Sequence, residues 1–289
     1  MNIITHRTDA YNIDDELSQL RKGFANEKEK LELFDELCEF EYGRWLLINR
    51  GLNAYWSYYM MFNNELNVKF HPLESKMIEQ SPGVIASRER ITTDLKLIQS
   101  MVKSNMTLAS VPCGFMNDLL RLNLDSVTDI KLVGVDLDAK AIEHAKENAK
   151  KLNKDSIVNF YLRDAWALNF ENAFDLIHSS GLNMYVQREV DLISLYANFY
   201  KALKPGGSLI TTSNMPPMDD NGELFWKVSQ EEYAALPMQG LLFGEIIKVR
   251  QGLHCTKNQI VNQLKAAGFS QVDVNHDSRN MFLSFVARK

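Results

Sequence analysis

The spacing of apolar residues divides the chain into two parts. In the first hundred residues, apolar side chains recur three and four positions apart, as at Leu17, Leu20 and Phe24. This spacing is typical of amphipathic helices. After Met106, short apolar runs alternate with helical patterns. Such alternation predicts βαβ units with right-handed crossovers, and therefore an α/β fold around a mostly parallel sheet.

The pattern predicts seven strands, the last two forming a terminal hairpin. Thr256 is a candidate helix N-cap and Gly268 a candidate helix stop. We predict helices over 14–40, 84–103, 116–122, 139–152, 189–203 and 256–267. The predicted strands are Thr107–Val111, Lys131–Val135, Ile157–Tyr161, Phe174–His178, Ser208–Ser213, Gln271–Asn275 and Met281–Ala287.

These elements suggest a helical N-terminal cap over residues 1–83 and a core domain over 84–289. Turn-forming residues in Met215–Cys255 indicate an insertion in that core. The aromatic and methionine cluster Tyr55–Phe62 has two interpretations. It is a helix packed in a core, or part of a lid whose side chains line an apolar substrate pocket.

Composition narrows the class of partner. The chain has 289 residues and a net charge of −5, which argues against a nucleic-acid partner. The sequence contains no apolar stretch of about eighteen residues or more, so we expect no membrane span. The N-terminal residues lack an apolar signal-peptide core. Three widely separated cysteines form neither a disulfide framework nor a zinc spacing, so we expect a reducing cytoplasm and no metal.

Four signals at strand ends carry the chemistry. They are Ser110–Gly114, Val133–Asp136, Leu162–Ala165 and Leu203–Gly207, in that order. A nucleoside cofactor without phosphates needs a tight backbone turn, an acid for its ribose and a second acid for its base. The order and spacing resemble the class I S-adenosylmethionine-dependent methyltransferases. The resemblance implies a doubly wound, Rossmann-like sheet of seven strands whose last strand is antiparallel.

The first motif departs from the family pattern of an acid followed by three alternating glycines. Ser110 stands in place of the acid, while Pro112, Gly114 and Met116 occupy the three glycine positions. Only Gly114 matches. The resemblance implies that Ser110, Cys113 and Gly114 border the cofactor. Cys113 is expected to be a small packing residue and not a nucleophile.

The second and third motifs match better. Asp136 ends a strand about twenty residues after Gly114, at the offset from which an acid binds both ribose hydroxyls. Asp138 is expected to cap the following helix, although either acid is suited to that role. The resemblance adds Leu137 to the cofactor residues. It also implies that Asp164 and the backbone of Ala165 bind the adenine.

The fourth strand and its loop are expected to approach the reacting groups, because ligands bind at the carboxyl ends of parallel strands. Ser179, Ser180 and Gly181 are predicted to border the cofactor sulfur. Asn183 and Tyr185 either face the methyl acceptor or are structural polar groups. Tyr185 and His254 are weak candidates for a catalytic role. His178 lies inside a strand and is interpreted as a buried histidine with satisfied partners.

The sequence therefore predicts methyl transfer from S-adenosylmethionine to an O, N or C nucleophile of a small molecule. A protein acceptor remains an alternative. So does an inactive, methyltransferase-like binding or scaffold protein, because the first motif is altered. A nicotinamide-dependent oxidoreductase is disfavoured, since Pro112–Met116 supplies too few glycines to pass a pyrophosphate. Neither the acceptor nor the oligomeric state follows from the sequence.

Overall fold

The computed structural model describes residues 13–66 and 68–289. The N-terminal segment that lacks a signal-peptide core therefore lies mostly outside the described residues. The chain forms two compact units. The helical unit comprises Met1–Ser87 and Val228–Arg250, and the sheet unit comprises Arg88–Lys227 and Gln251–Lys289.

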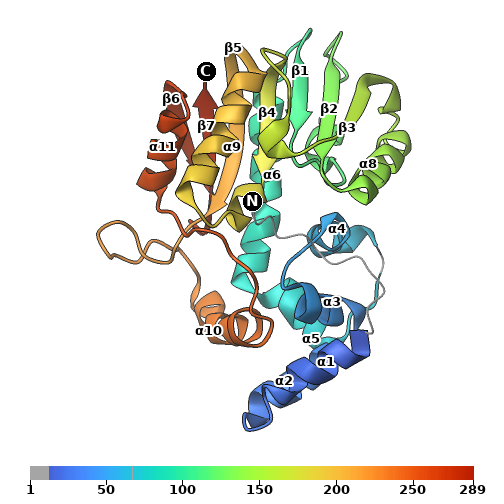
Figure 1. Ribbon diagram of the computed structural model, residues 1–289, viewed down its shortest axis with the longest axis vertical. Helices are drawn as coiled ribbons and strands as arrows, with labels where there is room; N and C mark the ends of the chain where they lie inside the picture. Colours follow the sequence, from blue (N-terminus) through green and yellow to red (C-terminus); the bar gives the residue numbers. More distant parts are fainter. Residues whose placement is uncertain (1–12, 67) are drawn as a thin grey trace. The chain divides into compact units, whose positions relative to one another are not determined.

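The sheet unit is built on seven strands in the order β3-β2-β1-β4-β5-β7-β6 (Figure 1). β7 alone runs opposite to the other six strands, and it pairs antiparallel with both β5 and β6. The predicted doubly wound, mostly parallel sheet with a terminal hairpin is thus confirmed. The strands are β1 Thr107–Ser110, β2 Lys131–Asp136, β3 Val158–Leu162, β4 Phe174–Ser180, β5 Leu203–Asn214, β6 Gln271–His276 and β7 Phe282–Arg288.

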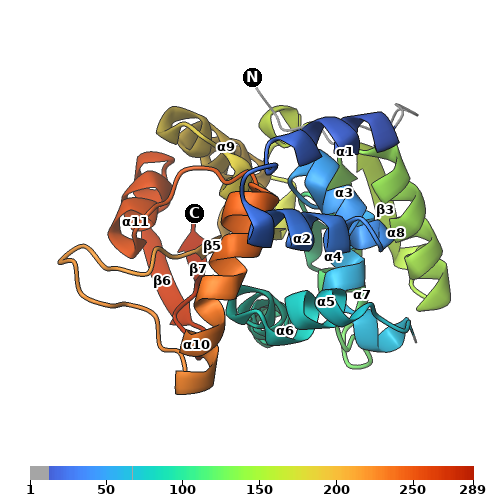
Figure 2. The same cartoon turned by 90° about the horizontal axis from the view of Figure 1, so that it is seen from below.

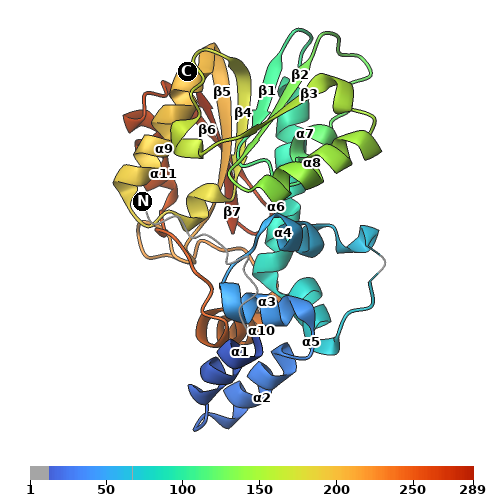
Figure 3. The same ribbon diagram turned by 45° about the vertical axis from the view of Figure 1, so that its right-hand side comes forward.

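Helices cover both faces of this sheet, as predicted for strands that are apolar on both sides. Ala109, Ile177 and Leu209 face the core shared with α9 and α11. Leu108 and Leu176 face the opposite core, which contains residues of α6, α7 and α8. Figure 3 shows α7 and α8 across the strands from α9 and α11. The helices are α6 Pro82–Met101, α7 Asn117–Leu120, α8 Ala139–Lys151, α9 Glu189–Ala202 and α11 Lys257–Ala266.

The helical unit has its own core. The predicted helix over 14–40 is two helices, α1 and α2, which pack against each other and against α3 (Figure 2). In α4, Trp56 and Tyr59 are buried, with ring centroids 5.3 and 5.7 Å from that of Tyr42. Trp56 and Tyr59 thus pack in a core, as the first interpretation of the aromatic cluster expects. The second interpretation, that the cluster belongs to a lid over a substrate pocket, stays a prediction. The helices are α1 Ile13–Lys22, α2 Lys28–Leu37, α3 Glu41–Asn49, α4 Ala54–Met61, α5 Pro72–Ser75 and α10 Gln230–Gln239.

The predicted insertion is shared between the two units. Its residues up to Lys227 belong to the sheet unit, whereas Val228–Arg250 belongs to the helical unit. The physical reason is burial, because Leu242, Ile246 and Ile247 lie in the core of the helical unit. Across the described part of the chain, no helix is long and apolar enough to cross a membrane.

Candidate functional site

The turn after β1 is tight although two of its glycine positions are filled by other residues. Gly114 and Met116 both adopt left-handed backbone conformations, with φ of 49° and 56°. Three backbone N–H groups of the turn donate hydrogen bonds that hold it. Cys113 N donates to Val135 O at 2.8 Å, Gly114 N donates to the Asp136 carboxylate at 2.9 Å, and Met116 N donates to Cys113 O at 2.6 Å. Partners and burial thus fix a backbone shape that glycines would adopt without support.

Packing explains how Met116 keeps this conformation. Its side chain is 1% exposed and belongs to the core under β1 and β2. A Cβ placed on Gly134 would lie 3.1 Å from the Met116 sulfur and 2.6 Å from Phe160 Cδ1. The methionine therefore fills space that the bare backbone of Gly134 leaves in β2. Burial of a side chain of this size contributes roughly 1.5–3 kcal/mol, which offsets the cost of about 1–2 kcal/mol of a left-handed residue.

Asp136 joins the first two motifs. One carboxylate oxygen accepts from Gly114 N at 2.9 Å and the other from Asp138 N at 3.0 Å. Burial raises the pKa of Asp136, and the backbone N–H groups of Asp138 and Gly114 oppose that rise. Asp138 caps α8, with its side chain accepting from Lys140 N at 2.9 Å. The prediction that Asp138 caps this helix is therefore confirmed.

The third motif forms a short turn beyond β3. Asp164 accepts a hydrogen bond from Trp166 N at 2.9 Å and so caps the 3-10 helix η4, Ala165–Ala167. Trp166 donates its indole N–H to Asp191 O, which fixes it against α9. Leu137 follows β2, Leu162 is the last residue of the neighbouring β3, and the two are 51% and 59% exposed. Apolar surface is thus available beside both acids.

The end of β4 places a buried hydroxyl next to the loop of predicted acceptor residues. Ser179 is 2% exposed, and the buried Ser180 Oγ has no partner among the described residues. Asn183 is buried and donates to the Tyr196 hydroxyl of α9 at 3.2 Å. The amide nitrogen of Asn183 therefore has a structural hydrogen-bond partner, which agrees with the interpretation of Asn183 as a structural polar group. Tyr185 is half-buried in the 3-10 helix η5, Leu182–Tyr185.

A polar cluster that the sequence did not reveal lies under the carboxyl ends of β1 and β4. His178 Nδ1 contacts Asp118 Oδ2 at 2.5 Å, and His178 Nε2 contacts Asp94 Oδ2 at 3.2 Å. Asp118 comes from α7 and Asp94 from α6. Ser110, the register partner of His178, donates its hydroxyl to Asp118 Oδ2 at 2.7 Å. We call Ser110, Asp118, His178 and Asp94 the aspartate–histidine cluster.

The cluster is charged. Burial alone would lower the pKa of His178, but the hydrogen bonds and charges of Asp118 and Asp94 outweigh it and raise the pKa to about 10. Burial opposes ionisation of Asp94, yet His178 and Ser284 hold its pKa below the ordinary value. Thr212 and Ser284, register partners on β5 and β7, also donate to Asp94, at 2.9 and 2.6 Å. The expectation of a satisfied buried histidine is thus confirmed, with two carboxylates as its partners.

Two further residues named from the sequence are His254 and Cys113. His254 is exposed in the segment before α11. Cys113 is buried, and burial raises the pKa of its thiol well above the ordinary value. A thiol of raised pKa is a poor nucleophile, in keeping with a packing role. Within residues 13–66 and 68–289, no group of three or more His, Cys, Asp or Glu side chains is placed to hold a metal ion.

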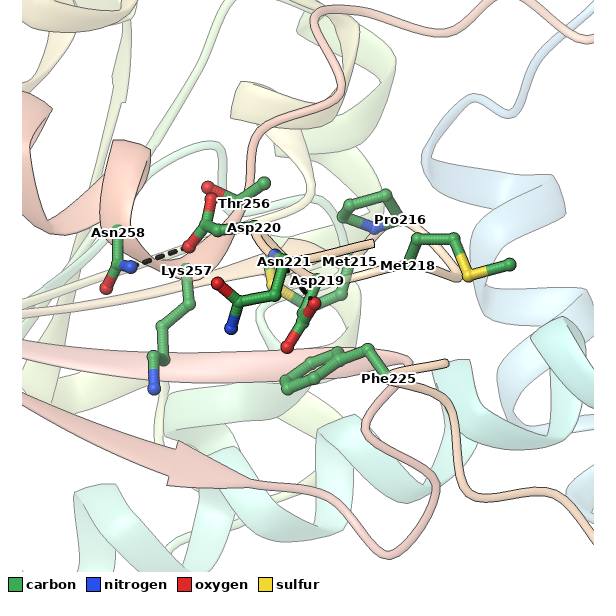
Figure 4. Close-up of a pocket in the computed structure, with 10 residues that line it drawn as sticks. All are labelled: Met215, Pro216, Met218, Asp219, Asp220, Asn221, Phe225, Thr256, Lys257 and Asn258. Carbon is green, nitrogen blue, oxygen red and sulfur yellow. Dashed lines mark hydrogen bonds between the residues drawn. The ribbon is translucent and has the colours of Figure 1, made fainter. Parts of the chain in front are cut away.

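A cavity of about 190 Å³ lies apart from these motifs, between the loop after β5 and the start of α11 (Figure 4). Its acids have structural partners. Asp219 accepts from the backbone of Asn221 and Glu223, and Asp220 accepts from the Asn258 side chain at 2.6 Å. None of the predicted cofactor residues lines it. The lining residues are Met215, Pro216, Met218, Asp219, Asp220, Asn221, Phe225, Thr256, Lys257 and Asn258.

Known proteins match either a part of this chain or, for two crystal structures, nearly all of it. A family model described as a methyltransferase domain matches residues 102–268. A crystal structure of a possible exported protein from Bordetella parapertussis is 31% identical, with a TM-score of 0.88, and the match covers 96% of this chain and 95% of that one. The S-adenosylmethionine-dependent methyltransferase SibL has a TM-score of 0.56 at 13% identity, covering 96% of this chain and 74% of that one, a likeness of fold alone.

A curated relative matches a shorter stretch. Phosphoethanolamine N-methyltransferase 1 of Arabidopsis thaliana is 30% identical over 122 residues. The match covers 42% of this chain and 23% of that protein. This chain therefore aligns with less than a quarter of the relative's length.

Proposed function

The chain belongs to the methyltransferase-domain family, and we propose that it transfers a methyl group from S-adenosylmethionine to a small-molecule nucleophile. The resemblance to the class I enzymes is confirmed by the family model and by the shared fold. The observation that carries the proposal is the position of Asp136. Its carboxylate ends β2 and accepts from the backbone of the turn after β1, at 2.9 Å.

The residues present fit this cofactor. Two hydrogen bonds occupy part of the Asp136 carboxylate, and the remaining lone pairs are free to accept from the two ribose hydroxyls. Asp164 uses Oδ1 to cap η4, and its other oxygen has no partner among the described residues. It would accept from the adenine amino group. Leu137 and Leu162 offer apolar contact for the base.

Binding and orientation are the main tasks left to the protein. When bound, S-adenosylmethionine supplies an activated methyl group on a sulfonium centre. Ser179 and Ser180 at the end of β4 would border the sulfur, and Tyr185 in the next turn would face the acceptor. Placing two reactants in line and excluding water accounts for much of the rate enhancement of such a transfer. Such a transfer does not require a general base, so the proposal does not depend on a catalytic role for the exposed His254.

The choice of a small acceptor rests on charge. A net charge of −5 disfavours polyanionic acceptors such as nucleic acids. The phosphoethanolamine methyltransferase relative matches this chain over only 23% of its own length, so its acceptor is one candidate for testing.

Calorimetric titration with S-adenosylhomocysteine tests the cofactor assignment. The wild-type protein is expected to bind it, and Asp136→Ala to bind at least about 100-fold more weakly, because two charge-assisted hydrogen bonds of roughly 1.5–3 kcal/mol each are lost. Asp138→Ala is the matched control and is expected to bind like the wild type. No binding to the wild type, or tight binding of NAD in its place, would overturn the proposal.

Turnover separates an enzyme from a binding protein. The release of S-adenosylhomocysteine is measured with phosphoethanolamine and with small amines, phenols and carboxylates, and then with peptides. Turnover with a small molecule supports the proposal, and turnover with peptides alone favours the protein-acceptor alternative. Tight cofactor binding without turnover on any of these acceptors favours the inactive scaffold.

A further inference from the structure

The acid that is absent from the end of β1 is supplied by the next helix. Ser110 occupies the strand position where the family pattern has an acid. Eight residues later, Asp118 in α7 turns its carboxylate back so that Oδ2 lies 2.7 Å from the Ser110 hydroxyl. A carboxylate therefore stands beside this strand end, although it enters from α7 and not from β1.

The surroundings of Asp118 hold this carboxylate in one place. His178, which pairs in register with Ser110, contacts the same oxygen at 2.5 Å. On its other side, His178 is anchored by Asp94 at 3.2 Å. Hydrogen bonds from Thr212 and Ser284 fix Asp94 in turn. Such a chain of supports keeps a binding group in a defined orientation.

The carboxylates of Asp94 and Asp118 differ in how many of their oxygens already accept hydrogen bonds. Asp94 is 2% exposed, and both of its oxygens accept hydrogen bonds from His178, Thr212 or Ser284. Asp118 is engaged through Oδ2 alone, and its side chain is 15% exposed. Its Oδ1 has no partner among the described residues. The accessible end of the aspartate–histidine cluster is therefore a carboxylate oxygen beside the first turn.

We propose that Asp118 binds the α-ammonium group of S-adenosylmethionine, with Ser110, His178 and Asp94 as positioning residues. The inference rests on the proposed function. The methionyl end of the cofactor carries the only primary ammonium group of that molecule. A carboxylate next to the turn that holds the cofactor is its natural hydrogen-bond acceptor. The altered first motif would then be a relocated acid and not a lost site.

A comparison of two ligands tests the assignment. S-adenosylhomocysteine and its analogue with hydrogen in place of the α-amino group are titrated into wild type and Asp118→Asn by calorimetry. For the wild type we expect 10- to 100-fold weaker binding of the analogue, the range for a hydrogen bond between charged groups. Asp118→Asn is expected to lose this preference, so that S-adenosylhomocysteine weakens by that factor and the analogue changes less than about twofold.

Controls separate the possible failures. Asp125→Asn, an exposed acid in the loop after α7, is expected to bind both ligands like the wild type. Should Asp118→Asn not fold, the charge-balanced variant D118N/H178Q is used with the same criteria. Equal weakening of both ligands, or unchanged discrimination between them, would overturn the role of Asp118. A wild-type protein that does not bind S-adenosylhomocysteine would instead contradict the proposed function.

Discussion

The ends of β1 and β2 place an acid at the same edge of the sheet in two different ways. At β2 the acid is part of the strand, because Asp136 is its last residue. At β1 the strand ends in Ser110, and Asp118 reaches the position from α7. Asp136 is held by backbone N–H groups, whereas Asp118 is held by a charged histidine and a hydroxyl.

The difference shows what each arrangement requires. A strand-borne acid can be held by backbone groups close to its strand end, so Asp136 accepts from Asp138 in the turn after β2 and from Gly114 in the turn after β1. An acid delivered by a helix needs support from elsewhere in the fold. His178 comes from β4 and Asp94 from α6, 84 residues apart in the sequence. The second arrangement thus makes the site depend on the packing of the whole sheet unit.

Replacement of His178 should have the largest effect. In His178→Leu, the carboxylates of the buried Asp94 and the partly buried Asp118 would face each other without the cation between them. Removing one member of a buried ion pair costs about 3–5 kcal/mol. Thermal or chemical unfolding of the variant measures the loss. His254→Leu, at an exposed histidine, is the control and should unfold like the wild type. A small loss for His178→Leu would mean that the cluster is not ionised as inferred.

The pH dependence of stability should follow the same histidine. The pKa of His178 rises on folding from its ordinary 6.5 to about 10. The folded state therefore holds a proton that the unfolded state releases, and stability falls as the pH increases between these values. The contribution is complete below pH 6.5 and lost above about 10. Unfolding curves from pH 6 to 10 should slope downward in the wild type and less steeply in His178→Leu.

A methyl group on Gly134 should disturb β2, the strand that carries Asp136. The added Cβ of Gly134→Ala would lie 2.6 Å from Phe160 Cδ1, so the ring must shift. Overpacking of this kind costs about 1–3 kcal/mol. Gly244→Ala is the control, because no atom lies within 4 Å of its added Cβ. Chemical unfolding compares the two variants, and equal stability would show that β2 yields to the methyl group without strain.

The smallest effect is expected at Asp138. Its carboxylate caps α8 by accepting from Lys140 N at 2.9 Å. Asp138→Ala should destabilise the protein by about 1 kcal/mol, the usual worth of an N-cap. Denaturant titration measures this change. Together with the calorimetric control, a stability loss without a loss of cofactor affinity would separate capping by Asp138 from binding by Asp136.

The sequence predicted the sheet because its signals are local. Apolar runs marked six strands to within two residues, although β5 begins five residues earlier than predicted, and Asp136 and Asp164 lie at or just beyond the ends of β2 and β3. The aspartate–histidine cluster was missed because its members are far apart in the chain. Asp118 and His178 are separated by 60 residues. One usable signal was present: His178, Thr212 and Ser284 interrupt apolar strands on the same face of the sheet.

The division of the insertion was also beyond the sequence. Residues 240–247 contain enough apolar side chains to predict burial, but periodicity does not say which core receives them. The structure places Leu242 and Ile246 with Phe34 and Leu37 of α2, about 200 positions earlier in the chain. The altered first turn was predicted in its residues but not in its backbone. Nothing in the residue type of Met116 indicates a left-handed conformation.

The two-part make-up of the helical unit has a consequence for biosynthesis. Its core lacks Leu242, Ile246 and Ile247 until Arg250 has left the ribosome, by which time five parallel strands have already been made. The N-terminal helices must therefore wait, with part of their apolar surface uncovered, through most of translation. A fragment ending at Ser87 should consequently be prone to aggregation, whereas co-expression with 228–250 as a separate peptide should restore its solubility.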